Sequence, residues 1–336
     1  MALLASLRGE YRTLSIVGTA KNAGKTTTIN YLIEEAEDEG LRLGITSTGR
    51  DGESTDIVTG TEKPKVYLYP GTIVSIPTGL FESASAGLEI LRMTKYHTSL
   101  GPVMLCRVVD SGYVQVAGPV ITADHRVMCD EMISYGAEMV LIDGAVDRRA
   151  IAQPATSDGI ILATGAVLSR DIRKVALETA YLVNLYELPE MEEGPLKERF
   201  AASEKLAVTK SGEVTELEVK TGLDAGSILD DYIDDDTEYV FIPGALTGSV
   251  ISGVHPGKFR NTVFVVRDPT KIFLTSNEWS VLKKKGFNAV VLKNIKVAAI
   301  SVNPVSPAGY SFEHEKLLEM MEKAVPGVRV IDVKLH

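Results

Sequence analysis

The chain has 336 residues, of which 45% are hydrophobic and 24% are charged, and its formal net charge is −10. This length exceeds that of most single domains, so we expect two globular domains, and the acidic balance argues against a broad surface for nucleic acid or for an anionic membrane. No apolar stretch approaches the roughly 20 residues that span a bilayer, and the apolar start, Met1 to Arg8, is too short for a secretory signal. We therefore expect a cytoplasmic protein with no membrane or nucleic-acid partner.

The chain has two cysteines, Cys106 and Cys129. They form neither a C-x-x-C pair nor a disulfide framework, and so few ligands argue against a structural zinc site. We expect both to be thiols of the hydrophobic core.

A glycine-rich segment follows the first apolar run of the chain. Leu14 to Val17 predicts a buried strand, and it leads into Gly18-Thr19-Ala20-Lys21-Asn22-Ala23-Gly24-Lys25-Thr26-Thr27. Apolar residues then recur at helical spacing and predict a helix from about Thr26 to Glu39, which ends at Gly40. Glycines let successive N–H groups face one anion, and the positive end of the helix dipole adds to that field. The order strand, glycine loop and helix therefore predicts a phosphate-binding loop.

The side chains of this loop have specific expected roles. Lys25 is expected to contact the β and γ phosphates, and the Thr26 hydroxyl is expected to bind Mg²⁺. An ordinary glycine turn that happens to contain Gly-Lys-Thr is the alternative. The expected nucleotide-binding residues all belong to the loop and the turn that follows it: Gly18, Thr19, Lys21, Asn22, Ala23, Gly24, Lys25, Thr26 and Thr27.

The loop departs by one residue from the strict spacing G-x-x-x-x-G-K-[ST], which has its first glycine where this chain has Thr19. The form found here resembles the variant phosphate loops of the SIMIBI class of P-loop NTPases, among which dethiobiotin synthetase and the molybdopterin-guanine dinucleotide accessory ATPases are similar. The resemblance implies ATP and Mg²⁺ as cofactors, although the spacing does not distinguish ATP from GTP. Lys21 is a candidate to reach a phosphate across a homodimer, as a signature lysine does in some related ATPases.

A second candidate loop follows the second apolar run. Leu41 to Ile45 predicts a buried strand, and Thr46 to Glu53 is small, polar and rich in glycine. Loops at the carboxyl ends of parallel strands converge on the ligand. Asp51 is therefore a candidate Mg²⁺ ligand and a candidate catalytic residue that orients or activates the nucleophile, with a solvated turn as the alternative.

The region from Val66 to Pro119 is less regular. Short strands are expected at 66–68, 103–108 and 114–117, with a helical pattern around Ser83 to Met93. Insertions of this kind often form the substrate or partner side of a nucleotide site.

A buried strand that ends in an acid follows. A helix is expected from about Thr122 to Tyr135, and Met139 to Ile142 leads directly into Asp143. Such a strand places one carboxylate beside a phosphate loop, where it holds the Mg²⁺ hydration shell, so Asp143 is the expected Walker B acid. The three charged residues beyond it are candidates for contacts at the same edge of the sheet: Asp147, Arg148 and Arg149.

The remaining pattern defines the fold class. A strand at Gly159 to Ala163 and a helix from Ser169 to Glu187 complete an α/β unit with right-handed parallel crossovers. We therefore expect a mainly parallel, doubly wound P-loop NTPase sheet in residues 1–190. Residues 191–205 are expected to connect it to a second, smaller α/β domain in residues 206–336, with a role in partner docking or oligomerisation.

Two segments at the ends of predicted strands, called the rim segments below, carry a closer resemblance to one family. They are Asp143-Gly144-Ala145-Val146-Asp147-Arg148-Arg149 and Ile161-Leu162-Ala163-Thr164-Gly165-Ala166, the latter followed by Ser169-Arg170-Asp171. They resemble the P-loop subunit of the reactivating factor for adenosylcobalamin-dependent lysine 5,6-aminomutase. The resemblance implies an ATP-driven chaperone that exchanges damaged cobalamin, with the aminomutase and a second reactivase subunit as partners. Only Lys25, Thr26 and Asp143 carry over as functional residues.

Two other functions stay open at this point. In the first, ATP activates a small acid, as in dethiobiotin synthetase, and the region 66–119 holds the substrate. In the second, the protein is a nucleotide-gated regulator that binds tightly without releasing phosphate.

Overall fold

The computed structural model describes residues 2–48, 65–144, 156–218 and 225–334. The chain divides into two compact units, the first made of Met1–Ala180 and Lys296–His336 and the second of Tyr181–Ile295. The chain passes from the first unit to the second within helix α4 (Ile172–Tyr186), and it returns just before strand β17 (Val297–Asn303).

The first unit is built on a nine-stranded sheet in the order β20-β17-β9-β1-β8-β2-β4-β6-β5. Every neighbouring pair from β20 to β4 is parallel, and β6 and β5 add an antiparallel hairpin at the edge. The remaining strands are β1 (Thr13–Gly18), β2 (Leu43–Ser47), β4 (Ile73–Pro77), β5 (Gly87–Thr98), β6 (Gly101–Asp110), β8 (Met139–Asp143), β9 (Gly159–Gly165) and β20 (Arg329–Asp332). The expected α/β class with a mainly parallel sheet is confirmed.

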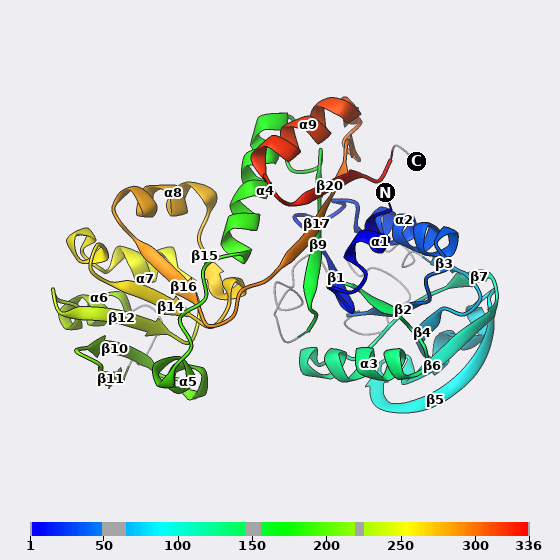
Figure 1. The fold of residues 1–336 in the computed structure, drawn as a ribbon, viewed down its shortest axis with the longest axis horizontal. Helices are drawn as coiled ribbons and strands as arrows, with labels where there is room; N and C mark the ends of the chain where they lie inside the picture. The colour runs from blue at the N-terminus through cyan, green and yellow to red at the C-terminus, as the bar shows by residue number, and fades with distance from the viewer. Residues whose placement is uncertain (1, 49–64, 145–155, 219–224, 335–336) are drawn as a thin grey trace. The chain divides into compact units, whose positions relative to one another are not determined.

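Helices cover both faces of this sheet (Figure 1). On strand β8, Leu141 packs in the cluster that contains Leu32 of α2 (Lys25–Asp38), whereas Ile142 packs in the cluster that contains Met132 of α3 (Thr122–Ser134). Strands that are buried on both faces read as continuous apolar runs, which is why 139–142 could be recognised in the sequence. The other elements of this unit are α1 (Leu3–Leu7), α9 (His314–Ala324), the 3₁₀ helix η1 (Thr78–Ser83), and the small strand pairs β3 (Val66–Leu68) with β7 (Gly112–Val114) and β18 (Val305–Ser306) with β19 (Tyr310–Ser311).

Strand β5 replaces the helix that was expected around Ser83 to Met93. It pairs antiparallel with β6, and its register shifts between Gly87 and Leu88, between Ile90 and Arg92 and between Met93 and His97. A β-bulge inserts an extra residue and breaks the alternation of a strand. The half-buried residues Leu88 and Leu91 consequently lie three apart, as on a helix, which explains the error.

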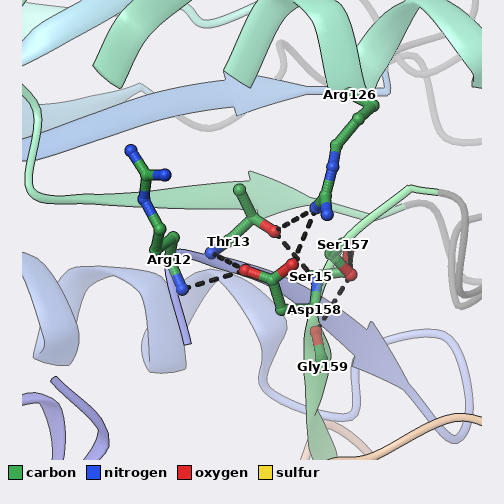
Figure 2. Close-up of polar contacts among 7 residues, drawn as sticks. All are labelled: Arg12, Thr13, Ser15, Arg126, Ser157, Asp158 and Gly159. Atoms are coloured by element: carbon green, nitrogen blue, oxygen red, sulfur yellow. Dashed lines mark hydrogen bonds and ion pairs between the residues drawn. The ribbon is translucent and has the colours of Figure 1, made fainter. Parts of the chain in front are cut away.

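Polar contacts join three elements at the amino end of the sheet (Figure 2). The Asp158 carboxylate accepts hydrogen bonds from the N–H groups of Arg12 and Thr13, both at 2.9 Å, and pairs with Nη1 of Arg126 at 2.8 Å. Burial alone raises the pKa of Asp158, but the Arg12 N–H, the Arg126 guanidinium and the Thr13 N–H outweigh it, so its pKa is lowered. These contacts hold β1, α3 and the start of β9 together.

The second unit has its own sheet, in the order β11-β10-β12-β14-β16. Strands β12 (Thr237–Ile242), β14 (Val263–Val266) and β16 (Asn288–Val291) are parallel, and β10 (Leu206–Lys210) and β11 (Glu213–Leu217) form an antiparallel hairpin beside β12. The smaller elements are α5 (Pro195–Ala202), α6 (Ala225–Tyr232), α7 (Gly248–Ser252), α8 (Ser276–Lys284), the turns η3 (Pro256–Phe259) and η4 (Pro269–Lys271), and the short parallel strands β13 (Leu246–Thr247) and β15 (Ile272–Phe273). Its core includes Phe259, Phe264 and Phe287, so the unit has a hydrophobic centre of its own.

The division into units differs from the expected boundaries. The sequence predicts that residues 206–336 form the second domain, but β17 pairs with β9 and β20 pairs with β17, so the last strands complete the first sheet. Residues 191–205 were expected to be a connection, but they contain α5, whose Phe200 is buried and stacks on Phe241 with ring centroids 4.7 Å apart. Sequence composition revealed neither the pairing of β17 with β9 nor the stacking of Phe200 on Phe241, because both are contacts between residues that are distant in the chain.

No helix in the described ranges is both long enough and apolar enough to cross a membrane.

Candidate functional site

The glycine-rich segment lies at the carboxyl end of β1, where the strand order reverses. Strand β1 lies between β8 and β9, and the chain reaches β2 on the β8 side and later β17 on the β9 side. In open α/β sheets, ligands bind outside the carboxyl ends of the strands at such a reversal. The position of the segment is therefore that of a ligand-binding loop.

The backbone of this segment turns through two left-handed residues. Asn22 has φ 62° and Gly24 has φ 104°, and α2 begins at Lys25 with Gly24 as its N-cap. Asparagine and glycine are the residues that tolerate this conformation best. No acidic side chain lies in the first turn of α2, so the positive end of that helix is not offset by a carboxylate of its own first turn.

The side chain of Lys25 folds back over the start of the loop. A Cβ atom at Gly18 would lie 3.1 Å from Cγ and 3.3 Å from Cδ of Lys25. A side chain at this position would crowd the lysine stem, which would have to shift by a few tenths of an ångström. Lys25, Thr26 and Thr27 are half-buried, and Lys21 and Asn22 are exposed.

Asp143 lies on the neighbouring strand. It is the last residue of β8, in register with Ile16 of β1 and Ser47 of β2, and it is half-buried. The N–H and the hydroxyl of Thr48 both donate to the carbonyl oxygen of Asp143, at 3.0 and 3.1 Å, which fixes the end of the strand. Asp143 therefore lies at the end of the strand that pairs with the strand preceding the loop.

Several candidate residues lie outside the described part of the chain. They are Asp51, Asp147, Arg148 and Arg149. The predictions for them stand as made.

Comparison of the chain with protein-family models, with curated proteins and with solved structures found no match.

Residues that were not predicted from the sequence support both ends of the loop. At its beginning, the Thr19 N–H donates to the Ala163 carbonyl oxygen at 2.9 Å. At its end, a Cβ atom at Gly24 would lie 3.0 Å from Cβ of Asn303, the last residue of β17. The sequence places Asn303 directly after a strand, at the start of a loop rich in proline, but it does not relate Asn303 to Gly24, because the pairing of β17 with β9 brings the two together across the inserted second unit.

Burial shifts the pKa values of one histidine and of both cysteines in the first unit. Burial lowers the pKa of His125 to about 4, and burial raises the pKa of Cys106 to about 11 and that of Cys129 to about 12. Both cysteines are buried, as predicted. Within the described residues, no three or more His, Cys, Asp or Glu side chains are grouped so that they could hold a metal ion.

Gly165 is expected to be intolerant of any side chain. A Cβ atom there would lie 2.0 Å from the Asn303 carbonyl oxygen, so β17 must move away from β9 and carry Asn303 away from Gly24. We expect Gly165→Ala to destabilise the first unit by about 2–3 kcal/mol, measured by chemical unfolding followed by circular dichroism. Gly244→Ala is the control, because a Cβ atom there meets nothing within 4 Å. Equal stability of the two variants would show that β17 and β9 are not held this closely.

Proposed function

We propose that the chain is a Mg²⁺-dependent P-loop ATPase of the SIMIBI class that reactivates an adenosylcobalamin-dependent aminomutase. The observation that carries the ATPase proposal is the start of α2. Its N-cap is the left-handed Gly24, it follows a buried strand at the reversal point of the sheet, and its first residue, Lys25, folds over Gly18. This arrangement presents backbone N–H groups and one ammonium group to an anion.

The proposed chemistry is attack of water on the γ phosphate. Lys25 and the loop N–H groups stabilise the charge that develops on the transferred phosphoryl group, and Asp51 orients the water. Thr26 in the first turn of α2 and Asp143 at the end of β8 offer the hydroxyl and carboxylate oxygens that Mg²⁺ prefers. Few protein ligands suffice, because Mg²⁺ keeps waters and phosphate oxygens in its shell, and when bound it neutralises charge on the β and γ phosphates.

The aminomutase proposal rests on the resemblance of the rim segments and on the second unit. Tyr181–Ile295 has a separate sheet and a separate aromatic core. An enzyme that only activates a small acid has no need of such a unit, whereas a chaperone needs a surface for its protein partner. A second reactivase subunit is part of the same proposal.

The test is phosphate release from Mg-ATP by the full chain, with and without an inactivated cobalamin-dependent aminomutase. We expect slow release by the protein alone and a clear rise when the aminomutase is added. Release that does not respond to the aminomutase would contradict the chaperone proposal. A rise that depends on an added small carboxylic acid would favour a synthetase of the dethiobiotin type, and nucleotide binding without any release would favour a regulatory role.

A further inference from the structure

Two covalent connections join the units. Each connection lies in an element that is joined to the glycine-rich loop by hydrogen-bonded hydroxyl groups. The first connection is α4, which leaves the first unit after Ala180. The second is the entry into β17, which begins one residue after Lys296.

The first link is a chain of hydroxyl groups that runs from the start of the loop to α4. The hydroxyl of Thr19, which is half-buried, shares its proton between the Ala163 carbonyl oxygen at 3.2 Å and the Thr164 hydroxyl at 3.3 Å. The Thr164 hydroxyl lies 2.9 Å from that of Thr179 on α4. Thr179 donates its proton to the Val175 carbonyl oxygen at 2.8 Å, so it accepts from Thr164. Thr164 and Thr179 are fully buried, with 0% of their surface exposed.

The second link runs from β17 to the end of the loop. The Ser301 and Thr28 hydroxyls lie 2.7 Å apart, and Thr28 donates to the Gly24 carbonyl oxygen at 3.0 Å, so Ser301 is the donor to Thr28. Both residues are buried. Two residues further along β17, Asn303 packs directly against Gly24.

We propose that nucleotide occupancy of the loop is coupled to movement of the second unit through these two links. The inference rests on the proposed function, because it requires that the loop binds nucleotide. A ligand that fixes the loop fixes Thr19 and Gly24, which are the loop ends of the links. A buried hydroxyl cannot replace a lost partner with water, so a shift at either end is costly unless the linked element moves with it. The coupling is reciprocal, so the position of the second unit also changes the affinity for nucleotide.

The test measures nucleotide binding and interunit distance on the same protein. Spin labels are attached at Ser134→Cys on α3 and at Lys284→Cys on α8, both of which are exposed positions in different units. The native cysteines are buried and do not compete for the label. Distance distributions are recorded with and without saturating Mg²⁺ and a non-hydrolysable ATP analogue, whose Kd is measured by calorimetry. We expect the analogue to shift the distribution.

The variants remove the links one at a time. In Thr164→Val and Ser301→Ala, and most completely in the double variant, we expect the shift to be lost while the Kd changes by less than about tenfold. Thr164→Ser keeps the hydroxyl and is expected to restore the shift. Ser15→Ala is the matched control: it removes the Ser15 to Ser157 hydroxyl bond of 2.9 Å at the opposite edge of the sheet, and it should leave the shift intact.

Each contrary outcome identifies which proposal fails. Absence of analogue binding by the wild type would overturn the proposed function and this inference with it. Binding with an unchanged distance distribution would overturn the inference alone. If the analogue shifts the distance distribution of a folded double variant as much as that of the wild type, the hydroxyl links do not carry the coupling. If the double variant does not fold, Ser301→Ala is the mildest change and tests the same point.

Discussion

Replacing Lys25 by alanine is expected to lower phosphate release from Mg-ATP by a factor of about 100 to 1,000. The stem of Lys25 lies against Gly18 at the start of the loop, and in the proposed function its ammonium group contacts the β and γ phosphates. Its removal takes away charge stabilisation that is needed most in the transition state, so the loss should fall mainly on kcat. Phosphate release under saturating Mg-ATP measures this effect.

Lys316→Ala is the control for this experiment. Lys316 is an exposed lysine on α9 in the same unit, so the variant removes the same charge without touching the loop. We expect its rate to equal that of the wild type. If Lys25→Ala releases phosphate at the wild-type rate, the loop is not the catalytic phosphate site, and the ATPase proposal is wrong.

Replacing Asp158 by asparagine is expected to destabilise the first unit by about 2–3 kcal/mol at pH 7. The carboxylate accepts from two backbone N–H groups and pairs with Arg126, and its side chain is only 26% exposed. Loss of the charge leaves the guanidinium without its anionic partner, with the Thr13 hydroxyl at 3.0 Å as its remaining contact in this cluster. Asp171→Asn is the control, because Asp171 makes a similar pair with Arg173 that is 54% and 79% exposed, and a change of less than about 0.5 kcal/mol is expected there.

The same contacts predict the pH dependence of this effect. The pKa of Asp158 is lowered in the folded state, so its carboxylate contributes stability above the pKa of an unfolded aspartate, about 3.9. That contribution is lost as the pH falls through the lower folded pKa. The difference between wild type and Asp158→Asn should therefore be full at pH 7 and shrink below about pH 4.

The two units can be followed separately in that measurement. The chain has one tryptophan, Trp279, which lies on α8 of the second unit and packs against Phe287 with ring centroids 5.9 Å apart. Tryptophan fluorescence therefore reports the second unit, and circular dichroism reports both. If Asp158→Asn lowers the stability measured by tryptophan fluorescence as much as that measured by circular dichroism, Asp158 does not act through the first unit alone.

The sequence was sufficient for features that depend on neighbouring residues. The buried strands at 14–17 and 139–142 and the helix behind the loop could be predicted, because each has a continuous or periodic apolar pattern and a glycine or an acid at its end. The candidate loop and Asp143 were found for the same reason. The rule that loops converge at the carboxyl ends of parallel strands then predicted that both lie at the same edge of the sheet, but the strand order was not predicted.

Features that depend on distant pairing were not predicted. Asn303 and the Thr164 to Thr179 contact support the loop, but nothing in their local sequence relates them to Gly24 or Thr19. The insertion of the second unit before β17 hid the fact that the last strands belong to the first sheet. Bulges in β5 produced a helical spacing of apolar residues on a strand.

The late position of β17 in the chain has a consequence for synthesis on the ribosome. Strand β9 stays an unpaired edge until the whole of Tyr181–Ile295 has been made and β17 has followed it. Unpaired edges of incomplete sheets are sites of aggregation, and contacts between distant residues form slowly. The second unit can fold before β17 is available, although the chain is still attached to the ribosome, because all of its residues precede β17 in the chain. The contact of Asn303 with Gly24 is thus among the last to form, so a nascent chain completes its candidate site only after the second unit has been synthesised.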